Sequence, residues 1–129
     1  MVARPAAFSS IQEFWPFYVS QHSKWGNRAF HFAGTSAAIL SVAAAVVERR
    51  PALLLAAVVL GYGLSWIGHY AIEKNRPATF GHPIWSLLCD FRMYGLMWRG
   101  KMTQEASRML SAGHQGVIAS PSSSLSSRA

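Results

Sequence analysis

Three histidines and a glutamate have the residue types and the spacing of a metal site: His22, His31, His69 and Glu73. Imidazole nitrogens combined with a carboxylate suit Fe(II), Mn(II) or Zn(II). Two histidines and one carboxylate on one side of an iron ion would leave positions open for a substrate and dioxygen. We therefore predict a metal centre formed by these four side chains. His82 and His114 lie in a predicted loop and tail and are left outside it.

Two apolar runs, residues 30–47 and 52–72, are expected to cross a membrane. They contain 18 and 21 residues, which as helices span roughly 27 and 31 Å, close to the ~30 Å hydrocarbon core of a bilayer. Only residues 48–51 separate them, and so short a link forces an antiparallel hairpin. Small residues recur at a spacing of four, which permits close helix contact, as in Gly34/Ala38, Ala37/Ser41/Ala45 and Gly61/Ser65.

The hairpin brings distant imidazoles to one depth. His31 lies 18 residues before Arg49, and His69 lies 19 residues after Arg50. An antiparallel arrangement therefore places both near the same membrane surface. Glu73 follows His69 by four residues, which is the same face of an α-helix. His22 ends the preceding helix and can fold back over this end.

Amphipathic segments flank the hairpin on both sides. Residues 9–22 are predicted to form a helix that begins with an S-x-x-E capping box at Ser10 and Glu13. Pro16 is expected to kink this helix or to mark its true start. A further helix is predicted over residues 83–99, whose aromatic and basic residues suit a position in the plane of the membrane surface.

The predicted fold is an all-α membrane protein, namely a two-span antiparallel helical hairpin flanked by N- and C-terminal interfacial helices. One helical membrane domain is expected over residues 9–110, after a flexible N-terminus at 1–8 and before a disordered, Ser-rich tail at 111–129. The composition agrees with this class, because 51% of the residues are hydrophobic and only 13% are charged, whereas soluble domains carry about 25% charged residues. A single cysteine, Cys89, excludes an internal disulfide.

The net charge of +7 implies an anionic partner. The basic residues lie near the apolar segments and no nucleic-acid-binding motif is present, so membrane lipid is the expected partner and nucleic acid is not. The hairpin loop carries two basic residues, Arg49 and Arg50, and the flanking segments carry nine. The positive-inside rule therefore places both termini in the cytoplasm. Whether the chain forms a homo-oligomer is left open by the sequence.

Two motifs resemble those of a known family. The first is Phe17-Tyr18-(x)3-His22-(x)4-Asn27-Arg28-(x)2-His31-(x)2-Gly34, and the second is Gly68-His69-(x)3-Glu73-Lys74-Asn75-Arg76-Pro77-Ala78. Together they resemble the small membrane proteins typified by the yeast endoplasmic-reticulum 2-hydroxy fatty acid dioxygenase, the Mpo1-like family. The resemblance covers about residues 11–100, and the second motif is the more specific.

The resemblance implies an Fe(II)-dependent dioxygenase of fatty acid α-oxidation, which shortens a 2-hydroxy fatty acid by one carbon with dioxygen. It implies iron ligation by His22, His31 and His69, with Glu73 at the acidic position of the family. Two departures stand out: the yeast protein has extra spans, and the second of its paired histidines is Ser23 here. Short versions of this kind indicate a bacterial inner membrane, or the endoplasmic reticulum if the host is eukaryotic.

Other interpretations stay open at this stage. Arg28 or Arg76 could hold a substrate carboxylate by a charge-assisted hydrogen bond, with Asn27 one helical turn before His31, or these arginines could pair with Glu73. A b-type haem carrier would use His31 and His69 as axial ligands. In a non-enzymatic membrane scaffold or binding protein, the histidines would only form hydrogen bonds.

Overall fold

The computed structural model describes residues 7–118, and side chains are described through residue 113. Within this part of the chain every regular element is a helix, which confirms the predicted all-α class. The elements in chain order are α1 (Ile11–Gln21), α2 (Trp25–Val47), α3 (Ala52–Ile67), the π-helix η1 (Gly68–Glu73), the short 3-10 helix η2 (Ala78–Phe80), α4 (Pro83–Trp98) and α5 (Met102–Ile118).

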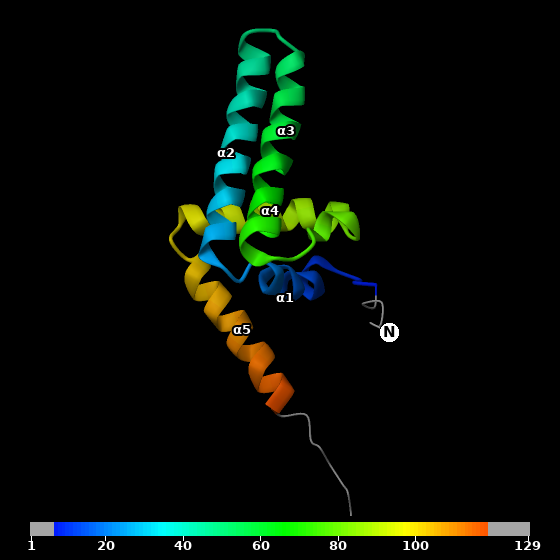
Figure 1. Ribbon diagram of the computed structural model, residues 1–129, viewed down its shortest axis with the longest axis vertical. Coiled ribbons are helices and arrows are strands. Elements are labelled where there is room, and N and C mark those ends of the chain that lie inside the picture. Colours follow the sequence, from blue (N-terminus) through cyan, green and yellow to red (C-terminus); the bar gives the residue numbers. More distant parts are fainter. Residues whose placement is uncertain (1–6, 119–129) are drawn as a thin grey trace, which may run out of the picture.

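Helices α2 and α3 lie side by side as the longest feature of the molecule (Figure 1). Trp25–Val47 and Ala52–Glu73 are each long and apolar enough to cross a membrane, as judged by length and composition. Their backbones approach closely where glycines face each other, since a Cβ on Gly34 would lie 2.9 Å from the carbonyl oxygen of Gly61. Helix α2 begins five residues earlier than the predicted boundary at residue 30, and these extra residues include two buried polar side chains, Asn27 and Arg28.

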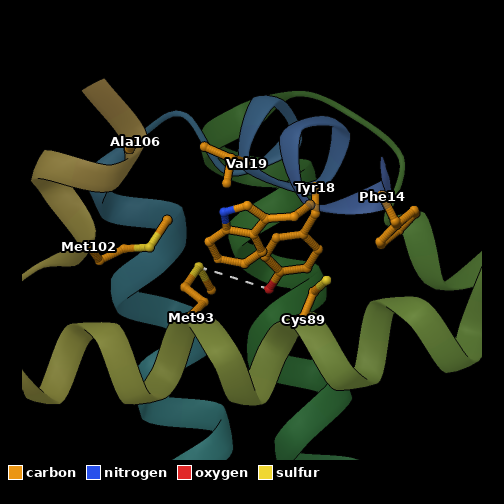
Figure 2. Close-up of a cluster of buried hydrophobic side chains, with 8 residues drawn as sticks. Phe14, Tyr18, Val19, Cys89, Met93, Met102 and Ala106 are labelled. Atoms are coloured by element: carbon orange, nitrogen blue, oxygen red, sulfur yellow. Dashed lines mark hydrogen bonds between the residues drawn. The ribbon is translucent and has the colours of Figure 1, made fainter. Parts of the chain in front are cut away.

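The main hydrophobic core lies at the end of α2 and α3 that is opposite their connecting loop, and not between these two helices. This end of the molecule is called the base. Helix α1 contributes four buried side chains, Phe14, Trp15, Tyr18 and Val19, which pack against α4 and α5 (Figure 2). The predicted N-cap forms, because Ser10 Oγ accepts from the Glu13 amide at 3.2 Å. The Glu13 carboxylate instead accepts from Ser9. Pro16 lies inside the helix, which stays continuous through it.

Helix α4 runs crosswise to α2 and α3, alongside their lower turns in the view of Figure 1. It buries Ser86, Cys89 and Met93. Its other side exposes large apolar residues, namely Ile84, Leu87, Leu88, Phe91 and Trp98. The helix therefore has two apolar sides, one buried in the protein core and one free.

Helix α5 departs from the predicted domain boundary. It continues to Ile118, so residues 111–118, assigned to a disordered tail by their Ser/Gly composition, are helical. Met102 and Ala106 anchor its first turns in the core, and a helix that has been nucleated adds further residues easily. Gly100, at φ +67°, ends α4 and lets the chain turn into α5. Residues 1–6 of the predicted flexible N-terminus and 119–129 of the predicted tail lie outside the described residues.

Candidate metal centre

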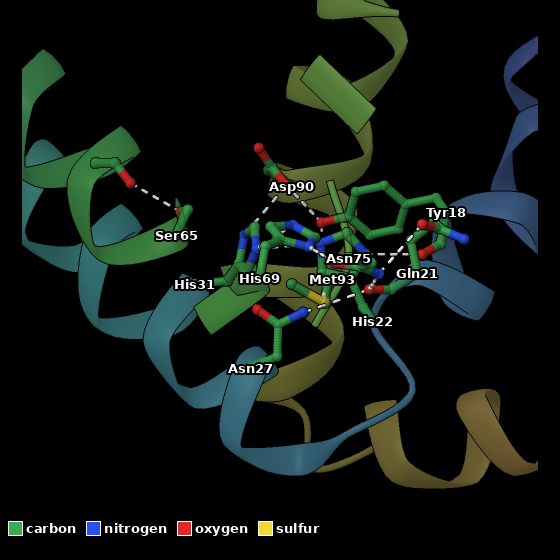
Figure 3. Close-up of polar contacts among 11 residues, drawn as sticks. Tyr18, Gln21, His22, Asn27, His31, Ser65, His69, Asn75, Asp90 and Met93 are labelled. Atoms are coloured by element: carbon green, nitrogen blue, oxygen red, sulfur yellow. Dashed lines mark hydrogen bonds and ion pairs between the residues drawn. The ribbon is translucent and has the colours of Figure 1, made fainter. Parts of the chain in front are cut away.

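Three imidazoles converge where α1, α2 and η1 meet (Figure 3). His22 follows the last residue of α1, His31 lies in the second turn of α2, and His69 lies in η1. The Nε2 atoms of His22 and His31 are 3.1 Å apart, and those of His31 and His69 are 3.0 Å apart. All three side chains are buried. Ring nitrogens from three separate elements thus share one small volume.

The Nδ1 atoms of His22 and His69, on the side of each ring away from the other histidines, form hydrogen bonds. His22 Nδ1 donates to the carbonyl oxygen of Tyr18 at 2.7 Å. His69 Nδ1 donates to Asn75 Oδ1, also at 2.7 Å. Asn75 is itself fixed, because its Nδ2 donates to the backbone oxygen and the side-chain oxygen of Gln21. Both rings therefore carry their proton on Nδ1, and their Nε2 lone pairs point at the shared volume.

The third ring faces a carboxylate from α4. His31 Nδ1 lies 3.4 Å from Asp90 Oδ1. The same oxygen accepts from the Tyr18 hydroxyl at 2.5 Å. His31 Nδ1 is nevertheless buried without a hydrogen-bond partner, so the carboxylate lies beside this ring but does not fix which ring nitrogen carries its proton. A carboxylate behind a ligating histidine fixes the orientation of the ring and raises its basicity.

The arrangement of donors fits a divalent metal ion. The Nε2 lone pairs of His22 and His69 both face His31 Nε2, which carries at most one proton, so at least one of these two close contacts joins two lone pairs unless a positive charge lies between them. Two nitrogens that bind one ion at about 2.1 Å and at a right angle are about 3.0 Å apart, which matches the two observed separations. Burial, and then the neighbouring His31 and His69, hold the pKa of His22 well below its ordinary value. The neutral form that binds metal is therefore favoured at His22.

Glu73 does not join the three histidines. Its carboxylate accepts from Ser23 Oγ at 3.0 Å and from the Lys24 amide at 2.5 Å. The expectation that it would share a face with His69 assumed α-helical geometry. Both residues lie in a π-helix, in which residues four apart are still about one turn from each other, so Glu73 is kept from the histidines by the hydrogen bonds that Ser23 and Lys24 donate to its carboxylate. Glu73 instead caps the first residues of α2.

The side chains considered for substrate binding have other contacts. Arg28 Nη1 donates to the carbonyl oxygens of His22 and Ser23, at 2.9 and 2.8 Å, and so closes the turn between α1 and α2. Arg76 is exposed and stacks on the Phe80 ring. Asn27 is fully buried, with its Oδ1 beside Gly68, where a Cβ would overlap it. None of the three lines the small cavity next to the histidines.

Sequence reasoning missed the residues that surround the histidines. Asp90 lies in the helix predicted over residues 83–99 and received no role there, although it borders the cavity next to the imidazoles. The available signal was weak, because Asp90 is simply the one acidic residue in α4. Asn75 and Tyr18 both stand inside the two motifs, so their positions were visible without their roles. Lys74, at φ +60°, makes the turn that brings Asn75 back to His69.

A family model described as 2-hydroxy-palmitic acid dioxygenase Mpo1-like matches residues 8–102. This range contains the three histidines, Asn75 and Asp90. No curated protein and no solved structure matches the chain.

Proposed function

Because the chain belongs to the Mpo1-like family, we propose that it is an Fe(II)-dependent dioxygenase that shortens 2-hydroxy fatty acids by one carbon. The observation that carries this proposal is the convergence of three Nε2 atoms from His22, His31 and His69 in a buried volume. Asp90 stands behind one of these rings, and Asn75 stands behind another. The family name supplies the reaction class, and the three imidazoles supply ligands suited to iron.

The overall reaction balances without an added reductant. A 2-hydroxy acid and dioxygen give a fatty acid one carbon shorter, carbon dioxide and water. Iron bound by the three histidines would polarise the substrate oxygens and activate dioxygen. The chain holds the His22 and His69 rings in place through the Tyr18 carbonyl and Asn75, and Asp90 lies beside the third ring. Burial of the site keeps bulk water from the reacting atoms.

The exposed surface supports a membrane setting for this reaction. Large apolar side chains on the outer surfaces of α2 and α3 are exposed, among them Leu40, Val46, Val47, Leu55 and Val59. Isolated apolar residues are common on soluble proteins, but a contiguous surface of this kind marks contact with lipid or with another protein. We propose that α2 and α3 span the membrane as a hairpin and that α4 lies at its surface. Helices α1 and α5 lie at the same end (Figure 1), which supports a position of both on one side of the membrane, and the positive-inside rule makes this the cytoplasmic side.

The geometry argues against the haem alternative. Axial ligands on opposite sides of one iron ion lie about 4 Å apart, with a macrocycle between the rings. Here the Nε2 atoms of His31 and His69 are 3.0 Å apart, and a third imidazole contacts both rings. The scaffold alternative is left to metal analysis, because hydrogen-bonded histidines alone would need no stoichiometric ion.

The test is anaerobic purification with added Fe(II), followed by exposure to oxygen with 2-hydroxypalmitate. We expect about one iron per chain and the appearance of pentadecanoate. His69→Ala should lose both. His82→Ala removes a histidine that packs against Phe8 and Phe14 outside the centre, so this control should keep both. An iron content or a product yield that is the same in His69→Ala and the unmodified protein would refute the proposal.

A further inference from the structure

A second cavity begins where the histidine site ends. It has a volume of about 310 Å³ and lies between α2, α3 and α4. Three of its lining residues also line the small cavity beside the imidazoles: Tyr62, Ser65 and Asp90. The two spaces are therefore neighbours that share a polar wall. A volume of this size is at the lower end of the range for small-molecule sites.

The walls of the larger cavity have the shape of a groove for a thin apolar chain. Its floor consists of small residues, Ala38, Ala57 and Gly61, of which Ala57 is buried. Its rim consists of large apolar residues that are partly exposed: Ile39, Val58, Leu87 and Phe91. Small residues below and large residues beside the opening leave a narrow apolar channel that is polar only near Asp90.

Helical spacing aligns this groove with the metal ligands. On α3, residues 57, 61 and 65 follow one another at intervals of four, and the next residue in the series is His69. On α2, Ile39 and Thr35 lead by the same interval to His31. From Ala57 to His69 the helix advances about 18 Å. At roughly 1.2 Å for each bond of an extended chain, this distance corresponds to about fifteen bonds.

We propose that this groove, named here the acyl groove, binds the hydrocarbon chain of the substrate and sets its length. The inference rests on the proposed function, because it assigns the occupant as the chain of a 2-hydroxy acid whose polar head lies at the histidines. The shared residues Tyr62, Ser65 and Asp90 make the groove continuous with that site. A chain enters from the bilayer side, between the exposed rim residues Val58 and Phe91.

The distal end of the groove offers a matched pair of variants. Val58 lines the groove and is 55% exposed, whereas the next residue, Val59, does not line it and is 60% exposed. Val58→Trp should fill the space of about three methylenes, each of which contributes roughly fourfold to binding. We expect a 10- to 60-fold lower kcat/KM for 2-hydroxypalmitate relative to Val59→Trp, with 2-hydroxydecanoate changed by less than about twofold. Ile39→Trp narrows the same end from α2 and should act in the same direction.

A second measurement does not depend on turnover. Palmitic acid with a diazirine at its terminal carbon is photolysed with the full-length protein in phospholipid nanodiscs, and the labelled residues are mapped. We expect labelling at residues 39 and 57–58 in preference to Val59, and suppression of it by excess 2-hydroxypalmitate. Labelling without turnover in any variant would overturn the proposed dioxygenase and keep the groove. Equal labelling of Val58 and Val59, no suppression, or the same chain-length preference in both tryptophan variants would overturn the groove.

Discussion

Gly34 is the position where the packing of the hairpin can be tested with one methyl group. A Cβ there would lie 2.9 Å from the carbonyl oxygen of Gly61, 3.3 Å from Leu64 Cβ and 3.4 Å from the carbonyl oxygen of Leu60. Two of the three atoms belong to the backbone and cannot rotate away. Gly34→Ala must therefore push α2 and α3 apart, which also separates His31 from His69.

The size of the effect follows from two opposed terms. Overpacking a tight contact costs about 1–3 kcal/mol, while replacing glycine by alanine inside a helix contributes roughly 0.5–1 kcal/mol of stability. Gly63→Ala isolates the second term, because a Cβ at Gly63 has no neighbour within 4 Å. The two variants should therefore differ by about 1–3 kcal/mol, with Gly63→Ala the more stable.

The assay is thermal unfolding followed by far-ultraviolet circular dichroism, together with metal affinity measured by competition with a chelator. Gly34→Ala should unfold at a lower temperature than Gly63→Ala, by roughly 4–12 °C for a domain of this size. It should also bind metal more weakly, whereas Gly63→Ala should bind it as the unmodified protein does. If the two variants unfold together and bind metal equally, the close approach of α2 and α3 does not hold the site together.

Three further outcomes are expected. Asn75→Ala removes the acceptor for His69 Nδ1 and should weaken metal binding about 10- to 100-fold in a chelator competition. A metal affinity equal to that of His82→Ala would contradict this expectation. Glu73→Ala removes the acceptor for the Lys24 amide and should lower the free energy of unfolding by about 0.5–2 kcal/mol in a thermal melt. The metal content should stay unchanged, because Glu73 lies outside the histidine cluster. Loss of the metal in this variant would show that Glu73 is a ligand. Burial raises the pKa of the Cys89 thiol to about 11, so iodoacetamide at pH 8 should modify this thiol only after denaturation, as mass spectrometry would show. Rapid modification of the folded protein would show that the core formed by α1, α4 and α5 is open.

Local patterns were sufficient to predict the elements that carry the histidines. The lengths of the two apolar runs and the short link between them were enough to place His31 and His69 at one depth, and their Nε2 atoms are 3.0 Å apart. The capping pattern at Ser10 marked the start of α1 within a residue or two. These features depend on neighbours in sequence, which is why composition and spacing reveal them.

The missed features depend on contacts between distant segments. Asp90 comes within 3.4 Å of His31 only because α4 runs across the lower turns of α2 and α3. The amphipathic pattern of α4 does not show which of its apolar sides is buried. Glu73 stays outside the cluster because its carboxylate accepts from Ser23 and from the Lys24 amide, contacts that its spacing from His69 does not indicate. Helix α5 extends past residue 110 because Met102 and Ala106 are anchored by α1 and α4, while the Ser/Gly composition alone favours disorder.

The histidines are divided between the two structural parts of the molecule. His22 belongs to the base, whose core is made by α1, α4 and α5, whereas His31 and His69 belong to the hairpin. An ion bound by all three would therefore clamp the base onto the hairpin. His22 is synthesised before the other two histidines. It can come close to His69 only after residue 69 has been synthesised and α3 has folded back against α2. Loading of the ion would therefore follow the folding back of α3, and without the ion the two parts would be held by packing and by hydrogen bonds such as those from Asn75 to Gln21.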